Sequence, residues 1–469
     1  MLRSLRLLSL SLLLIVLVSA CGGSATSSSP NTTTVVGGLA SDAGKTASPT
    51  IASATAPAGQ TPQPGAPAKL GTYSGAAVTQ KAPDFQALPG AKAAFGKLGQ
   101  AVYQIEMPDN WNGDLVMYAH GFAGFGTEVS VDPPPQALRK ELIDEGYAWA
   151  ASSFSENGYT PGIGADDTLA LKNYFIQQHG APKHTYLAGA SMGGNVVTLS
   201  LENFPKQYDG ALAVCGALTG EEEIDYLISW GMIAEYTSGV KLPIGEGAAK
   251  MTQALLLDMP KALGSADAPT QAGKQFASAV DYLTGGPRPF FAEGFKQQLL
   301  INFGLLLLDP NRQSVPGKAA TNVGVTYHID PALGLTDAQL NDGIQRLTAD
   351  PDARNATAHP DAVPTTGKIT VPLLTLHGTG DLFVPISVET AYRQKVAAAG
   401  AGDLLVQRAI RSAGHCQFSD AEYTQAFNDL VSWVKDGKKP AGDDISGDLS
   451  DIGKQFTNPI RPGDPGTKS

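Results

Sequence analysis

The sequence has few charged side chains, few histidines and few cysteines. Charged residues make up 16% of the 469 residues, and seven histidines and three cysteines are scattered along the chain. The formal net charge is −11 at pH 7, and Lys435–Lys439 is the one short basic stretch, so we expect no nucleic-acid partner. The histidines and cysteines lack the spacing of metal ligands, and no glycine-rich dinucleotide or phosphate loop appears. We therefore expect neither a metal nor a cofactor.

Hydrophobic residues are plentiful enough for a sizeable core. They make up 42% of the chain, which excludes overall disorder. The length fits one large domain or two domains of ordinary size.

The N-terminus has the pattern of an export signal. Arg3 and Arg6 precede an apolar run over residues 7–18. Such a run is too short to span a bilayer stably and is typical of a secretory signal, with an uncleaved membrane anchor as the alternative. The Ser-Ala-Cys sequence that ends at Cys21 resembles the bacterial lipobox, which implies lipid attachment to this cysteine. We expect a signal peptide over 1–20 and an exported protein anchored to a bacterial membrane, with the rest of the chain outside the cytoplasm.

Two further segments lack the pattern of a folded core. Residues 21–70 are rich in Ser, Thr, Ala, Gly and Pro, and cannot bury enough apolar surface to offset the entropy of ordering. We expect a flexible tether there. Residues 441–469 are polar and rich in Gly and Pro, and we expect a tail that is draped on the surface or loose.

From about residue 101, strand-like apolar runs alternate with helical patterns. Strands are expected over 101–107, 115–119, 147–154, 185–189 and 210–218, and helices over 135–145, 166–179 and 195–204. Alternation of this kind predicts an α/β fold, with a mostly parallel sheet covered by helices on both faces.

The alternation stops near residue 219 and returns near residue 368. The later strands are expected over 371–376 and 404–410, and the later helices over 387–399 and 421–435. One interrupted sheet is more economical than two domains, because the last strands need the first ones as partners. We therefore expect one core built from 71–219 and 368–440, with a largely helical cap inserted over 220–367.

A nucleophile motif lies between a predicted strand and a predicted helix. In Gly189-Ala190-Ser191-Met192-Gly193, the serine occupies a sharp turn, and the glycines avoid clashes with neighbouring chain. The start of the helix supplies N–H groups and a partial positive charge. We predict that Ser191 is a nucleophile supported by Gly189 and Gly193; the alternative is an ordinary serine at a helix cap.

A serine nucleophile needs a base and an acid that orients the base. His415 follows the last predicted strand, where its loop would reach Ser191, and we predict that it is the base. Asp381 lies in a glycine-rich turn after strand 371–376, and the order Ser191, Asp381, His415 fits such a triad. His377 is expected to orient the acid turn. The rival acids lie after the preceding strand: Glu221, Glu222, Glu223 and Asp225.

The tetrahedral intermediate of acyl transfer needs hydrogen-bond donors for its oxyanion. The N–H of Met192 is one predicted donor. The N–H of Phe122 is the other, with Gly121 letting the chain approach closely and His120 orienting the turn. A plain glycine-rich loop is the alternative.

Taken in order, these motifs resemble those of the α/β-hydrolase superfamily. His120-Gly121, the Gly-Ala-Ser-Met-Gly-Gly elbow, the Gly-Thr-Gly-Asp-Leu-Phe-Val-Pro turn and Gly414-His415 carry the resemblance, which covers about 100–219 and 368–435. It implies an α/β-hydrolase fold with an oxyanion turn, nucleophile, acid and base at these positions. His415-Cys416 also resembles the end of the tannase and feruloyl-esterase pattern, in which a cysteine before the serine is bridged to the cysteine after the histidine. Here Ala190 stands before the serine.

With Cys21 lipidated, two cysteines remain in an oxidising compartment. Cys215 lies in the strand after the nucleophile strand, and Cys416 adjoins His415. A disulfide between them would tie the base loop to the sheet, and two unlinked buried thiols are the alternative.

The predicted site implies two-step acyl transfer through an acyl-enzyme on Ser191. The family resemblance favours a carboxylic-ester hydrolase acting on a small-molecule or polymeric ester. A peptidase or amidase with the same triad, and a ligand-binding surface lipoprotein without activity, are the alternatives.

Overall fold

The computed structural model describes residues 70–71, 73, 75–307, 319–350, 353–354 and 363–459. The expected signal peptide, the lipidation site Cys21 and the tether up to residue 69 lie outside the described residues, as does the tail from residue 460. Within the described part of the chain, no helix is both long and apolar enough to cross a membrane.

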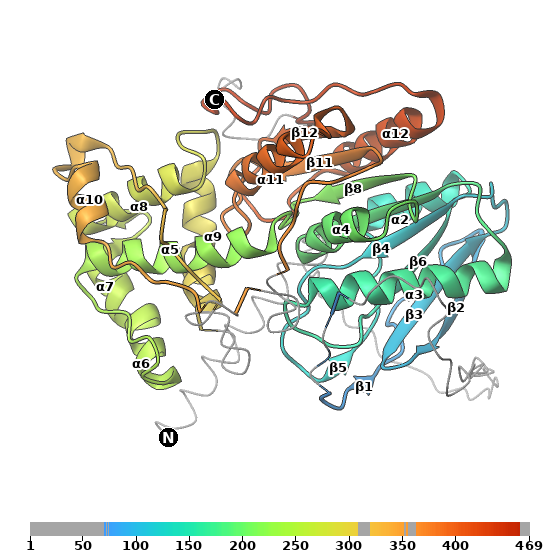
Figure 1. The fold of residues 1–469 in the computed structure, drawn as a ribbon, viewed down its shortest axis with the longest axis horizontal. Coiled ribbons are helices and arrows are strands. Elements are labelled where there is room, and N and C mark those ends of the chain that lie inside the picture. Colours follow the sequence, from blue (N-terminus) through green and yellow to red (C-terminus); the bar gives the residue numbers. More distant parts are fainter. Residues whose placement is uncertain are drawn as a thin grey trace, which may run out of the picture.

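An eight-stranded sheet forms the centre of the protein, in the order β12-β11-β8-β7-β4-β6-β3-β2 (Figure 1). The strands are β2 (Ala91–Leu98), β3 (Ala101–Pro108), β4 (Leu115–Ala119), β6 (Ala148–Ser152), β7 (Thr185–Ala190), β8 (Gly210–Val214), β11 (Leu373–Gly378) and β12 (Leu405–Ile410). β3 is antiparallel to both of its neighbours, and the other pairings are parallel. The predicted mostly parallel sheet is confirmed. Strand β2 was not predicted, because Ala91–Leu98 contains no β-branched residue.

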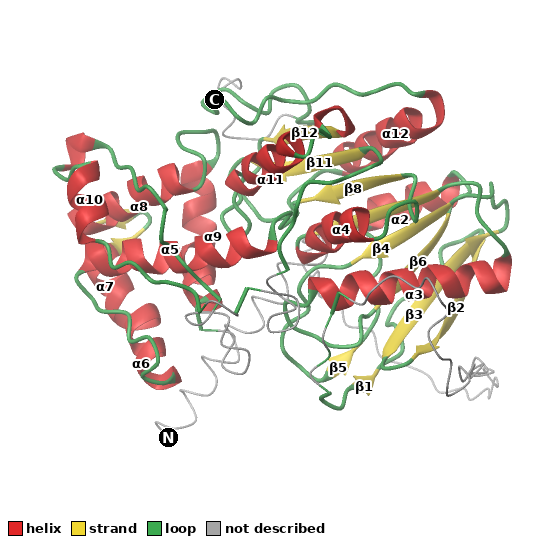
Figure 2. Ribbon diagram, in the orientation of Figure 1, coloured by secondary structure: helices red, strands yellow, loops and turns green. Residues whose placement is uncertain are grey.

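Helices cover both faces of the sheet (Figure 2). One face carries α2 (Gln136–Asp144) and α12 (Asp420–Asp436), and the other carries α3 (Pro161–His179), α4 (Met192–Asn203) and α11 (Ser387–Ala398). Side chains of β4 alternate between the two layers, since Val116 and Tyr118 pack with α2 and α12, whereas Leu115 and Met117 pack with α3 and α4. Burial on both faces explains the continuous apolar runs of the strands.

The chain between β8 and β11 forms a helical body beside the sheet, which we call the cap (Figure 1). Its elements are α5 (Gly220–Ser238), α6 (Ala248–Gln253), η1 (Ala254–Asp258), α7 (Met259–Leu263), β9 (Gly264–Ser265), β10 (Ala268–Pro269), α8 (Gln271–Leu283), α9 (Phe291–Leu305), η2 (Pro331–Leu333) and α10 (Asp337–Gly343). The cap has its own core around Trp230, whose ring contacts those of Phe276, Phe295 and Phe303. The insertion is therefore largely helical, as predicted.

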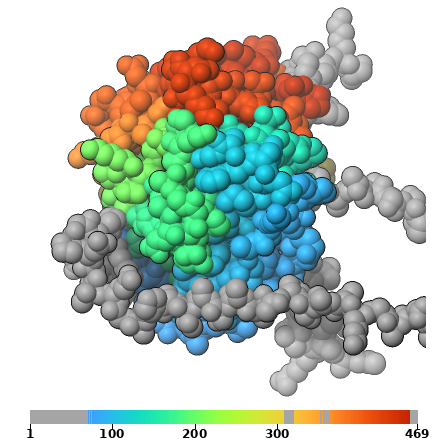
Figure 3. Space-filling model, turned by 90° about the vertical axis from the view of Figure 1, so that its right-hand side faces the viewer, coloured from blue at the N-terminus to red at the C-terminus, as the bar shows by residue number. Residues whose placement is uncertain are grey.

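The segment after α12 packs on the edge of the sheet over its described residues. Ile445, Leu449 and Ile452 are buried there against Ile386 and Ala409. The C-terminal part of the chain lies directly on the first half of the core across the face shown in Figure 3. Of the two alternatives expected for the tail, draped on the surface or loose, this described part has the draped arrangement, because three apolar side chains fix it to the protein.

Backbone segments approach one another closely where β7 meets α4. A Cβ atom on Gly189 would lie 2.2 Å from the carbonyl oxygen of Gly193, and one on Gly193 would lie 2.1 Å from that of Ala119. Any side chain at either position would overlap main-chain atoms. Both glycines are therefore needed for α4 to begin directly against the sheet.

We expect Gly193→Ala to lower the free energy of unfolding by about 3 kcal/mol, because the added methyl group overlaps a backbone oxygen that cannot rotate away. Urea-induced unfolding measures the change. Gly304→Ala in α9 is the matched control, since a Cβ there meets no atom within 4 Å. The control should be neutral or stabilising by up to about 1 kcal/mol. Equal stabilities of the two variants would contradict the close packing at Gly193.

Candidate active site

Ser191 occupies the sharp turn between β7 and α4. Its backbone angles are φ 56° and ψ −123°, which residues other than glycine rarely adopt. The backbone N–H of Ser191 donates to the carbonyl of Val214 at 3.0 Å, and its own carbonyl accepts from Gly194 and Ala217 at 2.8 and 3.1 Å. Hydrogen bonds from two neighbouring segments thus hold the strained conformation in place.

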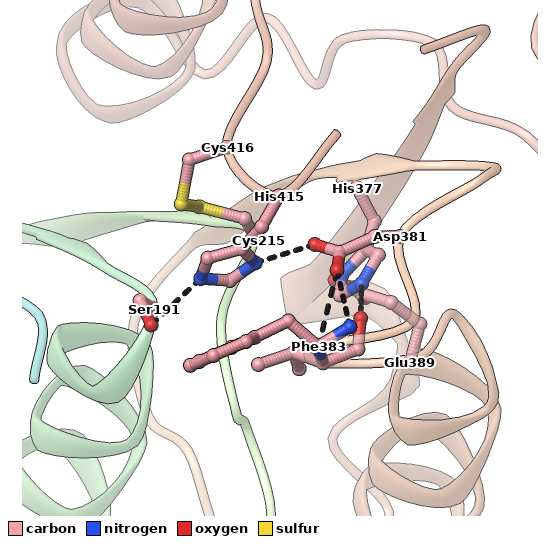
Figure 4. Close-up of a disulfide and its surroundings, with 9 residues drawn as sticks. Ser191, Cys215, His377, Asp381, Phe383, Glu389, His415 and Cys416 are labelled. Carbon is pink, nitrogen blue, oxygen red and sulfur yellow. Dashed lines mark hydrogen bonds and ion pairs between the residues drawn. A yellow bond between two sulfur atoms is a disulfide. The ribbon is translucent and has the colours of Figure 1, made fainter. Parts of the chain in front are cut away.

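A chain of hydrogen bonds joins Ser191, His415 and Asp381 (Figure 4). His415 Nε2 lies 2.8 Å from Ser191 Oγ, and His415 Nδ1 lies 2.6 Å from Asp381 Oδ2. The other oxygen of Asp381 accepts from the N–H groups of Phe383 and Val384 at 3.0 and 3.2 Å. The three residues follow β7, β12 and β11, so they meet at the carboxyl edge of the sheet, where α/β proteins bind ligands.

The four rival acids have other surroundings. Lys395 pairs with Glu221 and Glu222 at 2.7 and 2.8 Å, and Arg354 pairs with Asp225 at 2.7 Å. Glu223 is buried, and its burial, together with the nearby charge of Asp381, raises its pKa well above the usual range. The structure therefore places Asp381, and none of these four, against the base.

The loop after β4 lies against the nucleophile. A Cβ atom on Gly121 would lie 3.1 Å from the Cβ of Ser191, so the chain passes directly beside the serine. His120 Nδ1 lies 2.7 Å from the carbonyl oxygen of Gly121, and the His120 ring stacks on that of Phe154 with 4.0 Å between centroids. These contacts fix the turn that leads into Phe122. Met192 opens α4 on the other side of the serine.

Cys215 and Cys416 form a disulfide between residues 201 positions apart (Figure 4). Cys215 follows β8 and Cys416 follows His415, so the bond ties the base loop to the strand next to the nucleophile strand. Cys215 takes the place of the cysteine that the tannase pattern has before the serine. These two cysteines and His415 are also the one cluster of potential metal ligands among the described residues. With both sulfurs in the disulfide, only an imidazole is left to bind a metal.

A second histidine supports the acid turn from behind (Figure 4). His377 Nε2 lies 2.9 Å from the carbonyl oxygen of Val384, and its Nδ1 lies 3.2 Å from Glu389 Oε1. Burial lowers the pKa of His377, but the hydrogen bond and charge of Glu389, with the charge of Asp381 and the hydrogen bond to Val384, together leave the pKa raised. The sequence predicted an orienting role for His377. It gave no sign of Glu389, which reaches the turn from α11.

Aromatic side chains flank the three residues. The ring of Phe383 lies 4.7 Å from that of His415, measured between centroids. Tyr159 packs both with the apolar cluster that contains Met192 and Phe122 and with the cluster that contains Phe383. The surroundings of Ser191 are therefore apolar on the acid side and on the oxyanion side. Sequence reasoning assigned no role to Tyr159 or Phe383.

The sheet and the site together define an α/β-hydrolase. The order of the strands, the single antiparallel strand β3, the elbow after β7, and the acid and base after β11 and β12 are the features of that class. Residues 97–219 match a family described as a tannase-like family of unknown function (DUF6351). That description agrees with the resemblance carried by His415-Cys416.

Individual proteins show more distant likeness. o-Phthalyl amidase from Xanthobacter agilis is 21% identical over 396 residues, which cover 72% of this chain and 86% of the relative. An esterase from Aspergillus oryzae has a TM-score of 0.39 at 13% identity, over 75% of this chain and 80% of its own. Feruloyl esterase B from the same organism has a TM-score of 0.38 at 16% identity, over 76% and 82%.

The raised pKa of Glu223 predicts a specific pH dependence of stability. Native protein keeps the Glu223 proton at pH values where the unfolded chain has released it, so the free energy of unfolding falls as pH rises above about 4.5. Glu223→Gln has no proton to lose, and its stability should increasingly exceed that of wild type as pH rises. Urea unfolding at several pH values measures the difference, and parallel curves would contradict a buried, protonated Glu223.

Activity assays distinguish the role of Glu223 from that of Asp381, the proposed acid. Glu223→Gln resembles the protonated side chain, so its kcat should stay within about threefold of wild type. Asp381→Asn should lose on the order of 10⁴ in kcat, because an amide holds the histidine in the wrong tautomer. The opposite ranking would make Glu223 the acid.

Proposed function

We propose that the protein is a serine hydrolase that cleaves carboxylic esters through an acyl-enzyme. The observation that carries the proposal is the hydrogen-bonded chain from Ser191 through His415 to Asp381, with lengths of 2.8 and 2.6 Å. His415 Nε2 takes the proton of Ser191 as Oγ attacks the carbonyl carbon of the ester. Asp381 accepts from Nδ1 and stabilises the imidazolium that forms.

Negative charge then develops on the carbonyl oxygen of the substrate. The N–H groups of Met192 and Phe122 are the proposed donors to this oxyanion, and the N-terminal end of α4 adds its positive pole. Collapse of the tetrahedral intermediate breaks the ester C–O bond, and His415 gives its proton to the departing alcohol. Water, deprotonated by His415, attacks the acyl-enzyme, and the acid product leaves Ser191 free.

The aromatic residues around Ser191 support an apolar or aromatic substituent near the scissile bond. Phe383 lies on the side of the acid and base, Phe122 lies on the side of the oxyanion loop, and Tyr159 packs with both clusters. The tannase-like description of the family that matches residues 97–219 is in line with an ester of this kind. The proposed substrate is therefore a small-molecule or polymeric ester.

An amidase is the second candidate. It is favoured by the 21% identity with o-phthalyl amidase from Xanthobacter agilis. The same three residues cleave an amide when His415 protonates the leaving amine.

Matched p-nitrophenyl esters and p-nitroanilides with the same acyl group separate the two candidates. We expect higher kcat/KM for the esters, and we expect Ser191→Ala to abolish both turnover and labelling by a fluorophosphonate probe. Ser200→Ala, another buried serine of α4, is the matched control and should keep its labelling. Preference for the anilides would assign an amidase. Absence of both turnover and labelling in the wild-type protein would instead favour a ligand-binding lipoprotein.

We further propose that the protein is exported and held at a membrane surface by a lipid on Cys21. The lipobox-like sequence before Cys21 supports this proposal, and so does the Cys215–Cys416 disulfide, since such bonds persist in oxidising compartments.

Replacement of the lipidated cysteine tests the anchor. Cys21→Ser should abolish incorporation of labelled palmitate and move the protein out of the membrane fraction, because the anchor is lost. Ser24→Ala, three residues further along, should leave both unchanged. Incorporation of palmitate into Cys21→Ser at the wild-type level would refute the anchor at this position.

A further inference from the structure

The turn that carries Asp381 is enclosed between the cap and the base loop. A Cβ atom on Gly380 would lie 2.4 Å from the carbonyl oxygen of Phe290 in the cap and 2.8 Å from that of Ser412 in the base loop. A Cβ atom on Gly294, in α9, would lie 1.8 Å from the carbonyl oxygen of Gly380. The backbone of α9 therefore packs directly on the acid turn, with no side chain between them.

Gln298 lies one helical turn further along α9 and is only 3% exposed. Its Nε2 donates to the carbonyl oxygens of Gly380 and Ala413 at 3.0 and 2.8 Å. Its Oε1 accepts from the N–H groups of Leu382 and Phe383 at 2.9 and 2.8 Å. A longer contact of 3.4 Å joins Nε2 to the carbonyl oxygen of Gly294 within α9. Of the four shorter bonds, which fill the donor and acceptor capacity of the amide, three go to the acid turn and the one to Ala413 goes to the base loop.

Other cap side chains bind the acid turn alone. Asn302 Nδ2 and the hydroxyl of Tyr226 both donate to the carbonyl oxygen of Leu382 at 2.6 Å. Arg288 Nε donates to the carbonyl oxygen of Thr379, also at 2.6 Å. These three residues hold one loop, whereas Gln298 holds two.

We propose that Gln298 is a positioning residue for the triad, which aligns Asp381 with His415 by holding the acid turn and the base loop at once. The proposal rests on the proposed function of these two residues. Displacement of Gln298 would disturb Asp381 and His415 through only a few bonds each. The N–H of Phe383 that binds Gln298 also donates to Asp381 Oδ1, and Ala413 lies two residues before His415.

The role requires a side chain that both donates and accepts. Glutamate at this position keeps an acceptor for Leu382 and Phe383 but faces two carbonyl oxygens without a proton to donate. Methionine matches the length of glutamine and offers neither group. The two substitutions therefore remove the link to the base loop in different ways.

Steady-state kinetics of the full-length protein provides the first test. Gln298→Met should lower kcat about 30-fold and leave KM within about twofold, because it misaligns the acid and base without touching the substrate. Gln275→Met is the matched control. Gln275 lies in α8 of the cap and donates to the carbonyl oxygen of Leu333 at 3.0 Å, away from the triad. Its kcat should remain at the wild-type level, and an equal loss in both variants would overturn the proposal.

A double-mutant cycle separates positioning from a merely structural role. In the Asp381→Asn background, Gln298→Met should lower kcat by no more than about threefold, since the carboxylate that it positions is already lost. The same 30-fold loss in both backgrounds would overturn the proposal. Gln298→Glu is used in the same cycle if Gln298→Met does not fold, with the same non-additivity expected and additivity as the refuting result.

A measurement without substrate distinguishes this proposal from the proposed function. The proton between His415 Nδ1 and Asp381 Oδ2 should give a far-downfield proton NMR signal, identified by its loss in His415→Gln. Gln298→Met should shift or broaden that signal, and Gln275→Met should leave it unchanged. Sensitivity to Gln298 supports positioning even if the wild-type protein hydrolyses none of the esters tested. An unchanged signal in Gln298→Met would overturn the proposal.

Discussion

The hydrogen bond between His415 and Asp381 depends on more of the chain than its two loops. The cap holds the acid turn from one side, and the His377–Glu389 pair holds it from the other. The base loop begins at Arg411, whose guanidinium donates to the carbonyl oxygen of Ile452 in the C-terminal segment at 2.8 Å. A bond of 2.6 Å between two loops thus requires the inserted cap, α11 and the end of the chain to be folded.

Buried charge around the acid turn is compensated in three different ways. Asp381 accepts hydrogen bonds from His415 and from two backbone N–H groups. Glu389 lies against His377, whose raised pKa favours its protonated form. Burial and the charge of Asp381 raise the pKa of Glu223, which favours its neutral form. Each of the three carboxyl groups is therefore accommodated in its apolar surroundings by different neighbours.

Local sequence signals were sufficient to predict the sheet and the positions of the central residues. Alternation of apolar runs and helical patterns gave the parallel strands, and the elbow around Ser191 lies between a strand and a helix in the structure as well. The order of the turns along the chain then pointed to Asp381 and His415. These signals work because neighbouring residues determine them.

Residues whose role depends on distant contacts gave no such signal. Gln298 binds carbonyl groups 82 and 115 positions away, and in the sequence it is one of two adjacent glutamines that look alike. The role of Glu389 could not be predicted for the same reason. The pairing of Cys215 with Cys416 stayed open in the sequence, because only the fold brings two residues 201 positions apart into bonding distance. The burial of Ile445, Leu449 and Ile452 was missed, because three isolated apolar residues in a stretch rich in Gly, Asp and Ser did not stand out as a buried segment.

The Cys215–Cys416 disulfide closes a covalent ring that contains the whole cap, since the cap begins after Cys215 and ends before the strand that leads to Asp381. The two points at which the cap joins the core are fixed by the disulfide and by adjacent strands of the sheet, and neither depends on the length of the chain between them. The entropy of closing a loop grows only slowly with its length, by about 0.6 kcal/mol for each doubling. Evolution can therefore lengthen, shorten or exchange the outer helices of the cap at little thermodynamic expense, provided that α9 keeps its place on the acid turn.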